Sequence, residues 1–319
     1  KDPFMLEVII SALLPIIITL MIGFFAGWRG EFTANQASTL NKMVLRYALP
    51  MTLFSGILSL PKTQILSSGS AAIILLLAMA GGYLITLGIG YFACQRPVNE
   101  SALLALSVSA PAVPFVGITV LGHLFGTAST ILVSICSLMM NLVQVPVTIF
   151  LLSAYSPKKN TDKIATDSSF FSHIRHAFTE PIVIAPILAL ICVSLSIPFP
   201  ETLKSSLMLL GKATGGVALF SSGIILFSRK VILSKTVASL VLSKNIIIPT
   251  AVWVLASINK TPPLIIEQTT ITMAIPSAAI TTMLAIRYQL MEQDMASTLF
   301  FSTILSIISM GGFILLTAI

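Results

Sequence analysis

Ten apolar segments, each of about 20 residues or more, recur along the chain and restrict its fold more than any other feature. A helix rises about 1.5 Å per residue, so each segment is long enough to cross about 30 Å of hydrocarbon. Only 9% of the 319 residues are charged, whereas soluble domains have about a quarter. The sequence therefore predicts an all-α polytopic membrane protein. The segments lie near 7–28, 34–58, 69–94, 99–121, 127–154, 179–198, 202–227, 236–258, 263–287 and 295–317.

The longest polar stretch, residues 156–176, separates five of these segments from the other five. We set residues 1–4 aside as a cloning remnant, and expect one five-helix unit at 5–155 and a second at 177–319. Loops after the odd-numbered segments carry ten Lys and Arg residues, and the opposite loops carry three. Because short cytoplasmic loops are enriched in these cations, the polar stretch is predicted to be cytoplasmic, with both termini on the periplasmic or extracellular side.

The two five-helix units contain similar short strings in the same order, separated by 162 to 168 positions. The strings are Ala128–Ser134 and Ala296–Ser302, Leu53–Ile57 and Leu219–Ile224, and Pro114–Thr119 and Pro276–Thr281. Because each unit has an odd number of helices, related units must cross the membrane in opposite directions. The sequence therefore predicts an inverted repeat.

Prolines interrupt segments four and nine at positions that this repeat makes equivalent. The run SAPAVPFVG begins at Ser109 and holds Pro111 and Pro114, and Pro276 precedes Ser277. A proline inside a helix removes a backbone donor, and hydrocarbon offers no replacement partner. An ordinary proline kink is one interpretation. Paired interruptions in inverted repeats instead indicate the binding site of a secondary transporter, where the N-termini of half-helices attract anions. We therefore predict that broken helices 4 and 9 cross, and that all five residues bind substrate.

Ionisable side chains within the apolar segments are further candidates, because a charge in hydrocarbon is costly and marks a pathway. Arg46 and Lys212 are equivalent under the repeat. They either attract an anionic solute, pair structurally with a carbonyl or an acid, or line a vestibule. Lys42 is predicted to extend to the cytoplasmic interface. Glu267 lies early in segment nine and is predicted to be a cap or an interfacial residue, with proton carriage as the alternative.

Amide side chains extend the candidate substrate site. Asn245 directly follows Lys244 in segment eight, and this pair predicts anion binding, with the amide orienting the amine or the ligand. Asn141 and Gln144 lie in the middle of segment five. They either contact the ligand or form hydrogen bonds between helices.

Catalysis and nucleic-acid binding have little support in the sequence. The three His residues lie in loops or at segment ends without metal-ligand spacing, and no Gly-rich phosphate loop precedes a helix. The net charge of +7 comes from cations spread among short loops rather than from a basic stripe. The three Cys residues are isolated in apolar runs, as is typical of small buried side chains. We expect neither an enzyme, nor a cofactor or metal site, nor a nucleic-acid partner.

Three stretches resemble the auxin efflux carrier family, in particular its bacterial branch of malonate and organic-acid transporters. They are Leu40–Pro50, Thr179–Pro186 and Gly211–Phe220. Plant PIN proteins, more distant members, carry Asn-Pro-Asn at the interruption of helix 4, whereas this chain has Ser109-Ala110-Pro111. The departure removes side-chain amides that would meet the carboxylate of auxin, and leaves backbone N–H groups as the anion donors.

The resemblance implies two inverted five-helix repeats, similar to bile-acid sodium symporters, in a bacterial inner membrane. It implies a scaffold domain from helices 1, 2, 6 and 7, a transport domain from helices 3–5 and 8–10, and a homodimer. The resulting hypothesis is a secondary active transporter of a small organic anion, a mono- or dicarboxylate such as malonate, working by elevator-type alternating access. H⁺ or Na⁺ is the expected coupling ion. Alternatives are a substrate-gated channel, a transporter-like receptor, or an exporter of a neutral amphipathic solute.

Overall fold

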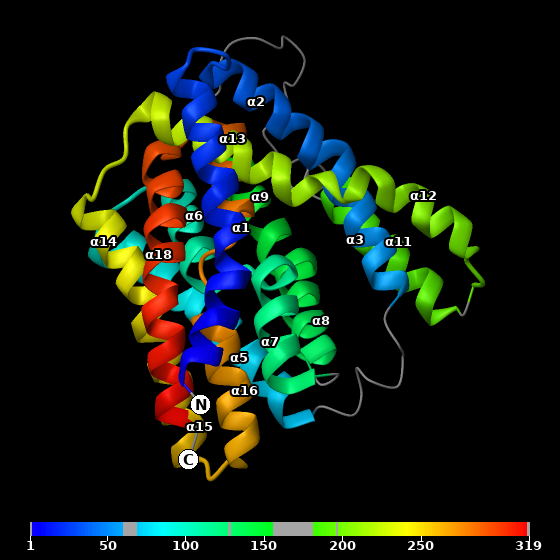
Figure 1. The fold of residues 1–319 in the computed structure, drawn as a ribbon, viewed down its shortest axis with the longest axis vertical. Helices are drawn as coiled ribbons and strands as arrows, with labels where there is room; N and C mark the ends of the chain where they lie inside the picture. Colours follow the sequence, from blue (N-terminus) through cyan, green and yellow to red (C-terminus); the bar gives the residue numbers. More distant parts are fainter. Residues whose placement is uncertain (1, 60–68, 127–128, 156–180, 196, 318–319) are drawn as a thin grey trace.

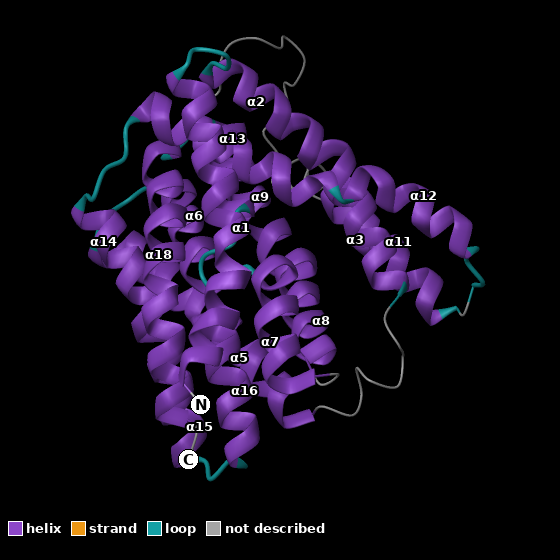
Figure 2. Ribbon diagram, viewed as in Figure 1, coloured by secondary structure: helices purple, strands orange, loops and turns teal. Residues whose placement is uncertain are grey.

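The computed structural model describes residues 2–59, 69–126, 129–155, 181–195 and 197–317, so the predicted polar loop at 156–176 lies outside the described residues. Within these ranges the regular structure is entirely helical, which confirms the all-α prediction (Figure 2). Among the described residues, five continuous runs are long and apolar enough to span a membrane. They are Gly69–Ala93, Leu132–Tyr155, Glu201–Arg229, Lys235–Ile258 and Glu292–Thr317. Helices also occupy the other predicted apolar segments.

The helices before the polar loop, with π-helical turns labelled η, are α1 (Asp2–Trp28), α2 (Ala34–Met43), η1 (Val44–Ala48), α3 (Leu49–Leu58), α5 (Gly69–Gly88), η2 (Ile89–Ala93), α6 (Val98–Ser109), η3 (Val113–Gly117), α7 (Ile118–Phe125), α8 (Ser129–Met139), η5 (Met140–Gln144) and α9 (Val145–Tyr155). Those after it are α11 (Pro181–Ser194), α12 (Glu201–Gly211), α13 (Ala213–Arg229), α14 (Lys235–Leu242), η6 (Ser243–Ile247), α15 (Ile248–Ile258), α16 (Pro263–Ala274), α17 (Ile280–Tyr288) and α18 (Glu292–Thr317).

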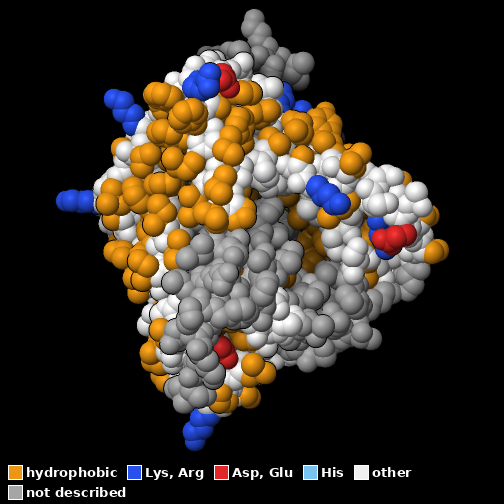
Figure 3. All heavy atoms as spheres, in the orientation of Figure 1, with side chains coloured by type: hydrophobic (Ala, Val, Ile, Leu, Met, Phe, Trp, Pro, Cys, Tyr) orange, Lys and Arg blue, Asp and Glu red, His pale blue; other side chains and the backbone are white. Residues whose placement is uncertain are grey.

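The helices form one large bundle with a smaller group beside it. α5 to α9 and α14 to α18 lie together in the bundle, whereas α3 packs on both α11 and α12 to one side (Figure 1). α1 packs along α13, and α1 begins at the same end of the molecule where α18 ends (Figure 1). Figure 3 shows apolar side chains over much of the described part of the visible surface, with few and scattered Lys and Arg side chains. Such a surface is suited to hydrocarbon, as a multi-pass membrane protein requires.

The contact between α1 and α13 depends on two glycines that face each other. A Cβ on Gly223 would lie 2.1 Å from the carbonyl oxygen of Leu20, and a Cβ on Gly23 would lie 2.1 Å from that of Phe220. No side chain fits at such distances, so the missing Cβ atoms let the two backbones approach closely. Close approach through small residues is a main source of helix association in membranes, where hydrophobic driving force is absent.

Three π-helical turns share a sequence cause. η1, η5 and η6 each end two residues before a proline, namely Pro50, Pro146 and Pro249. A proline cannot donate to the carbonyl four residues back, and its ring pushes that carbonyl away. The residue just before each proline donates instead to the carbonyl five residues back, as Leu49 does to Val44. Such widened turns occur frequently at functional sites.

Candidate functional site

The two proline-containing interruptions lie side by side in the bundle. The stretch between α6 and η3 runs antiparallel to the stretch between α16 and α17. The Ala112 N–H donates to the Pro276 carbonyl at 2.9 Å, and the Ala278 N–H donates to the Ala110 carbonyl at 3.1 Å. Each break therefore supplies partners for backbone groups that the other break releases, which removes part of the cost of interrupting a helix in hydrocarbon.

Ser277 connects this paired backbone to two neighbouring helices. Its hydroxyl donates to the Ser107 carbonyl in α6 at 2.8 Å, and its N–H donates to the Ser302 hydroxyl in α18 at 3.1 Å. Ser302 in turn donates to Asn245 Oδ1 at 2.7 Å, and Asn245 Nδ2 donates to the Ser302 carbonyl at 2.8 Å. This two-bond exchange fixes η6 against α18 and links it to the interruption.

Lys244 is the most unusual residue of this network. Its side chain is 0% exposed, and its Nζ donates to the Met273 carbonyl in the last turn of α16 at 3.2 Å. No carboxylate lies within ion-pair distance of this amine in the described part of the chain. A buried cation without an acid is costly, and a carbonyl dipole compensates only part of that cost. The arrangement leaves Lys244 with capacity to bind an anion.

Gln144 contacts the first interruption, at the end of α6, from η5. Its Nε2 donates to the Ser109 hydroxyl at 2.9 Å and to the Met79 carbonyl at 3.0 Å, which joins η5, α6 and α5. Ser109 itself donates to the Ala105 carbonyl at 2.7 Å. Within the part of the chain that the structure describes, the buried Oε1 of Gln144 has no hydrogen-bond partner, so it is an acceptor that remains available to a ligand or water.

The structure thus brings together most of the residues predicted to bind substrate. Ser109, Gln144, Lys244, Asn245 and Ser277 all belong to the network around the paired interruptions. Pro111 and Pro276 form part of the interruptions themselves, and both are buried. Pro114 lies in η3, and its side chain is outside what the structure describes.

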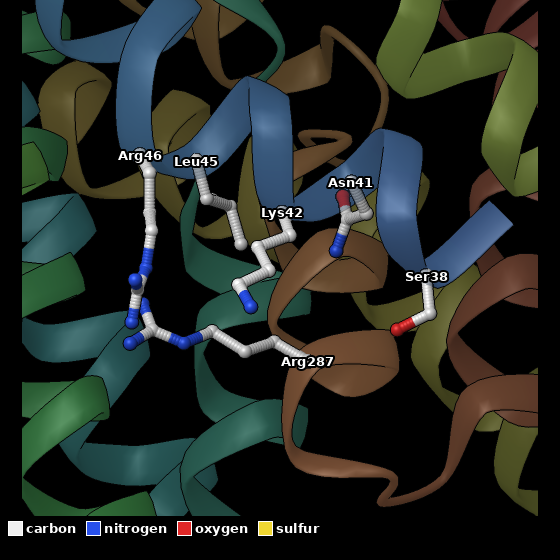
Figure 4. Close-up of a pocket in the computed structure, with 6 residues that line it drawn as sticks. All are labelled: Ser38, Asn41, Lys42, Leu45, Arg46 and Arg287. Atoms are coloured by element: carbon white, nitrogen blue, oxygen red, sulfur yellow. The ribbon is translucent and has the colours of Figure 1, made fainter. Parts of the chain in front are cut away.

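Other predicted residues lie apart from this network. Asn141 is buried and donates to the Ser137 carbonyl of its own helix at 2.8 Å. Glu267 is half-buried near the start of α16, and Lys212 is exposed between α12 and α13. Arg46 lines a cavity of about 240 Å³ whose described lining contains none of the interruption residues (Figure 4).

Sequence reasoning missed several polar groups of the site. Ser302 was recognised only as the end of a repeated string, and Ser107 was not singled out. Thr270 and Thr281, in the two helices that flank the second interruption, carry buried hydroxyls that have no hydrogen-bond partner among the residues described. The available signal was spacing: Ser302 lies four residues after Thr298, on one face of α18, and Thr270 lies one turn before the end of α16.

In chemical terms, the site combines a buried amine, an amide oxygen that bonds to no described residue, and hydroxyl groups around two paired backbone interruptions. Such a set suits a small anion, with the amine as the charge partner and the polar groups as orienting contacts. Among the described residues, no group of three or more His, Cys, Asp and Glu gathers in a way that could hold a metal ion.

Comparisons with known proteins show the family to which the chain belongs. The family described as membrane transport protein matches residues 8–314, a range that includes both interruptions and Lys244. The uncharacterized transporter YfdV of Escherichia coli strain K12 is 32% identical over 253 residues, which cover 77% of this chain and 78% of that protein. Proteins of the same name from Escherichia coli O157:H7 and Shigella flexneri match with the same identity and coverage.

Proposed function

Because the chain belongs to the membrane transport protein family, that of the auxin efflux carriers, we propose that it is a secondary active transporter of a small organic anion. The observation that carries the proposal is Lys244, which is fully buried, has no carboxylate partner among the described residues, and lies beside the paired interruptions. Ionisable residues in membrane spans mark substrate or ion pathways, because their cost is not retained without a function.

A mono- or dicarboxylate such as malonate fits this proposal. One carboxylate would accept a hydrogen bond from Lys244 Nζ and displace the weaker contact to the Met273 carbonyl. Backbone N–H groups at the start of α17, which follows the second interruption, add a partial positive charge. Asn245 orients the amine, because its two hydrogen bonds with Ser302 hold η6 in place.

The movement that we propose is an elevator-type alternation between two bodies. Helices 1, 2, 6 and 7, here α1, α2 with α3, α11, and α12 with α13, would form the scaffold, and the remaining helices would carry the crossed interruptions. What supports this division is that α1 packs on α13, and α3 on α11 and α12, whereas the paired interruptions lie within the bundle (Figure 1).

The same proposal includes an inverted repeat of two five-helix units and a homodimer in the bacterial inner membrane. Both termini would lie outside the cytoplasm, and H⁺ or Na⁺ would drive transport. Support for this orientation comes from the loop cations, ten against three on the two sides.

Uptake into proteoliposomes tests the function directly. Purified protein is reconstituted, and uptake of labelled malonate and other small carboxylates is measured under imposed proton, sodium and voltage gradients. Lys244→Met removes the buried charge while keeping the volume, and Lys235→Met, at an exposed position of the same helical run, is the matched control.

We expect gradient-dependent accumulation that falls at least about tenfold in Lys244→Met, since a charge-assisted hydrogen bond contributes about 1.5–3 kcal/mol. Lys235→Met should retain gradient-dependent accumulation at the wild-type level. Flux that only equilibrates the carboxylate, whatever the gradient, would favour a channel. Undiminished accumulation in Lys244→Met would contradict the proposed role of the amine.

A further inference from the structure

A second concentration of positive charge lies outside the candidate transport site. Between α2 with η1 on one side and α17 on the other is the cavity of about 240 Å³ introduced above. Its described lining consists of Ser38, Asn41, Lys42, Leu45, Arg46 and Arg287. Three of these six residues are cations and none is acidic. The cavity is therefore strongly positive.

The three cations converge on one volume. Figure 4 shows the guanidinium groups of Arg46 and Arg287 next to each other, with the Lys42 amine directed to the same space. Lys42 and Arg46 are one turn apart on one helix face, a spacing at which like charges repel. Neither forms an ion pair or hydrogen bond with a described residue. The Arg287 guanidinium lies 5.6 Å from the centre of the Tyr288 ring, a cation–π contact that helps to orient it.

Asn41 lines the same cavity and has a buried hydrogen-bond acceptor. The residue is 1% exposed, and its Nδ2 donates to the Met283 carbonyl of α17 at 2.6 Å. Because a carbonyl only accepts, this bond determines which end of the amide carries the nitrogen. The buried Oδ1 has no hydrogen-bond partner among the described residues. A ligand that completes the cavity therefore needs negative oxygens for the cations and one O–H or N–H group for Asn41.

We propose that this cavity binds a phosphate group that carries or adjoins a hydroxyl. Hydrogen phosphate is a dianion that keeps one O–H group, and its oxygens match a guanidinium fork. Its own O–H would donate to Asn41 Oδ1. A phosphoglycerol lipid headgroup offers the same combination, with a phosphodiester oxyanion and glycerol hydroxyls. Sulfate, and a carboxylate without a hydroxyl substituent such as malonate, are fully deprotonated near pH 7 and have no such donor. The cavity is thus distinct in chemistry from the carboxylate site at Lys244, and the inference does not depend on transport.

The chain contains a matched control for this site. Lys212 is the repeat equivalent of Arg46, is exposed, and is absent from the described lining of the cavity. We compare the double variant K42Q/R46Q with K212Q and with the wild-type full-length chain in detergent. The altered side chains are exposed, so the variants are expected to fold. Melting temperature and isothermal titration are measured with inorganic phosphate, and with sulfate as an ion of similar shape that lacks a proton.

A second arm identifies the source of the phosphate. The protein is reconstituted into vesicles of phosphatidylcholine with and without phosphatidylglycerol, then extracted and examined by native mass spectrometry. Phosphatidylcholine has the phosphodiester but no headgroup hydroxyl. Retention of phosphatidylglycerol that excludes inorganic phosphate assigns the site to a lipid headgroup, whereas phosphate binding without retained lipid assigns it to the free ion.

The expected result is binding of phosphate or phosphatidylglycerol that weakens at least about tenfold in the double variant and is unchanged in K212Q. Sulfate and phosphatidylcholine should bind at least about tenfold more weakly than their hydroxyl-bearing counterparts. Equal binding by sulfate and phosphate, equal affinity in the double variant, or no binding of either phosphate source would overturn the proposal. K244M should bind phosphate normally, which separates a failure of this site from a failure of the proposed transport site.

Discussion

η1 and η6 are two π-helical turns of the same length, each with one cation and each ending two residues before a proline. Their cations nevertheless have different surroundings. Arg46 in η1 is exposed in a cavity with two other cations, whereas Lys244 in η6 is fully buried against a carbonyl. Because the local backbone is the same, the difference comes from packing. η1 faces an open cavity beside α17, and η6 is closed in by α16 and α18.

A proline two residues after a turn therefore determines the π-helical backbone of that turn, but it does not determine whether the cation in the turn is buried or exposed. The neighbouring helices determine whether the cation at the turn attracts a ligand to an open cavity or holds one in the interior. We therefore expect changes at Lys244 to affect transport and stability, and changes at Arg46 to affect neither strongly.

The largest expected effect is on uptake. Lys244→Met should reduce the initial rate of gradient-driven carboxylate uptake to near background, since the site loses its only buried charge among the described residues. Arg46→Met should keep uptake within about threefold of wild type, because an exposed charge in water contributes little. Initial rates in proteoliposomes of matched protein content provide the measurement. Equal losses in both variants would remove the distinction between the two turns.

The next effect is on stability: the Lys244 substitution that lowers uptake should increase the stability of the fold. Lys244→Met should raise the melting temperature in detergent, because it removes the cost of burying an amine that has no carboxylate partner among the described residues. Arg46→Met, at an exposed position, should leave it unchanged. Thermal unfolding followed by tryptophan fluorescence or light scattering measures the shift. A lower melting temperature in Lys244→Met would mean that the amine is structural.

A smaller effect is expected at Ser302, whose hydroxyl joins the second interruption to Asn245. Ser302→Ala leaves the Ser277 N–H and Asn245 Oδ1 without this partner and should cost about 1–3 kcal/mol of stability. Ser306→Ala is the control, because the Ser306 hydroxyl bonds only within α18, to the Thr303 carbonyl at 2.7 Å. Ser302→Ala should melt several degrees below Ser306→Ala. Equal melting temperatures would mean that the hydrogen bonds of Ser302 to Ser277 and Asn245 do not stabilise the fold.

The smallest effects should come from the prolines that follow the turns. Pro249→Ala restores a donor to the carbonyl of Asn245 and allows η6 to tighten, which should lower carboxylate uptake several-fold by moving Lys244. Pro50→Ala should do the same to η1 and weaken phosphate binding while uptake remains unchanged. Parallel uptake and phosphate titrations on both variants check this. If Pro249→Ala weakened phosphate binding and Pro50→Ala lowered carboxylate uptake, the assignment of η6 to transport and of η1 to phosphate binding would be contradicted.

The sequence predicted the helices well, because hydrocarbon requires apolar segments of a fixed minimum length. It also predicted the interruptions at Pro111 and Pro276, since a proline in such a segment releases backbone groups that need new partners. The inverted repeat and the scaffold and transport domains remain predictions.

The sequence could not predict which cations are buried. Arg46 and Lys212 looked equivalent from the repeat, yet one lines a cavity and the other is exposed between two helices. Nor did it indicate that Lys244 would contact the Met273 carbonyl, or that Gly223 would press against Leu20. These contacts join segments far apart in the chain, and hydropathy carries no information on which helices become neighbours.

The most direct test of the account is the affinity of the purified protein for malonate, measured by isothermal titration in wild type, Lys244→Met and the Lys42→Gln/Arg46→Gln double variant. The account predicts that wild type and the double variant bind malonate with similar affinity, and that Lys244→Met weakens binding at least about tenfold. Unchanged affinity in Lys244→Met, with affinity lost in the double variant, would place the carboxylate at the exposed cavity and contradict the account.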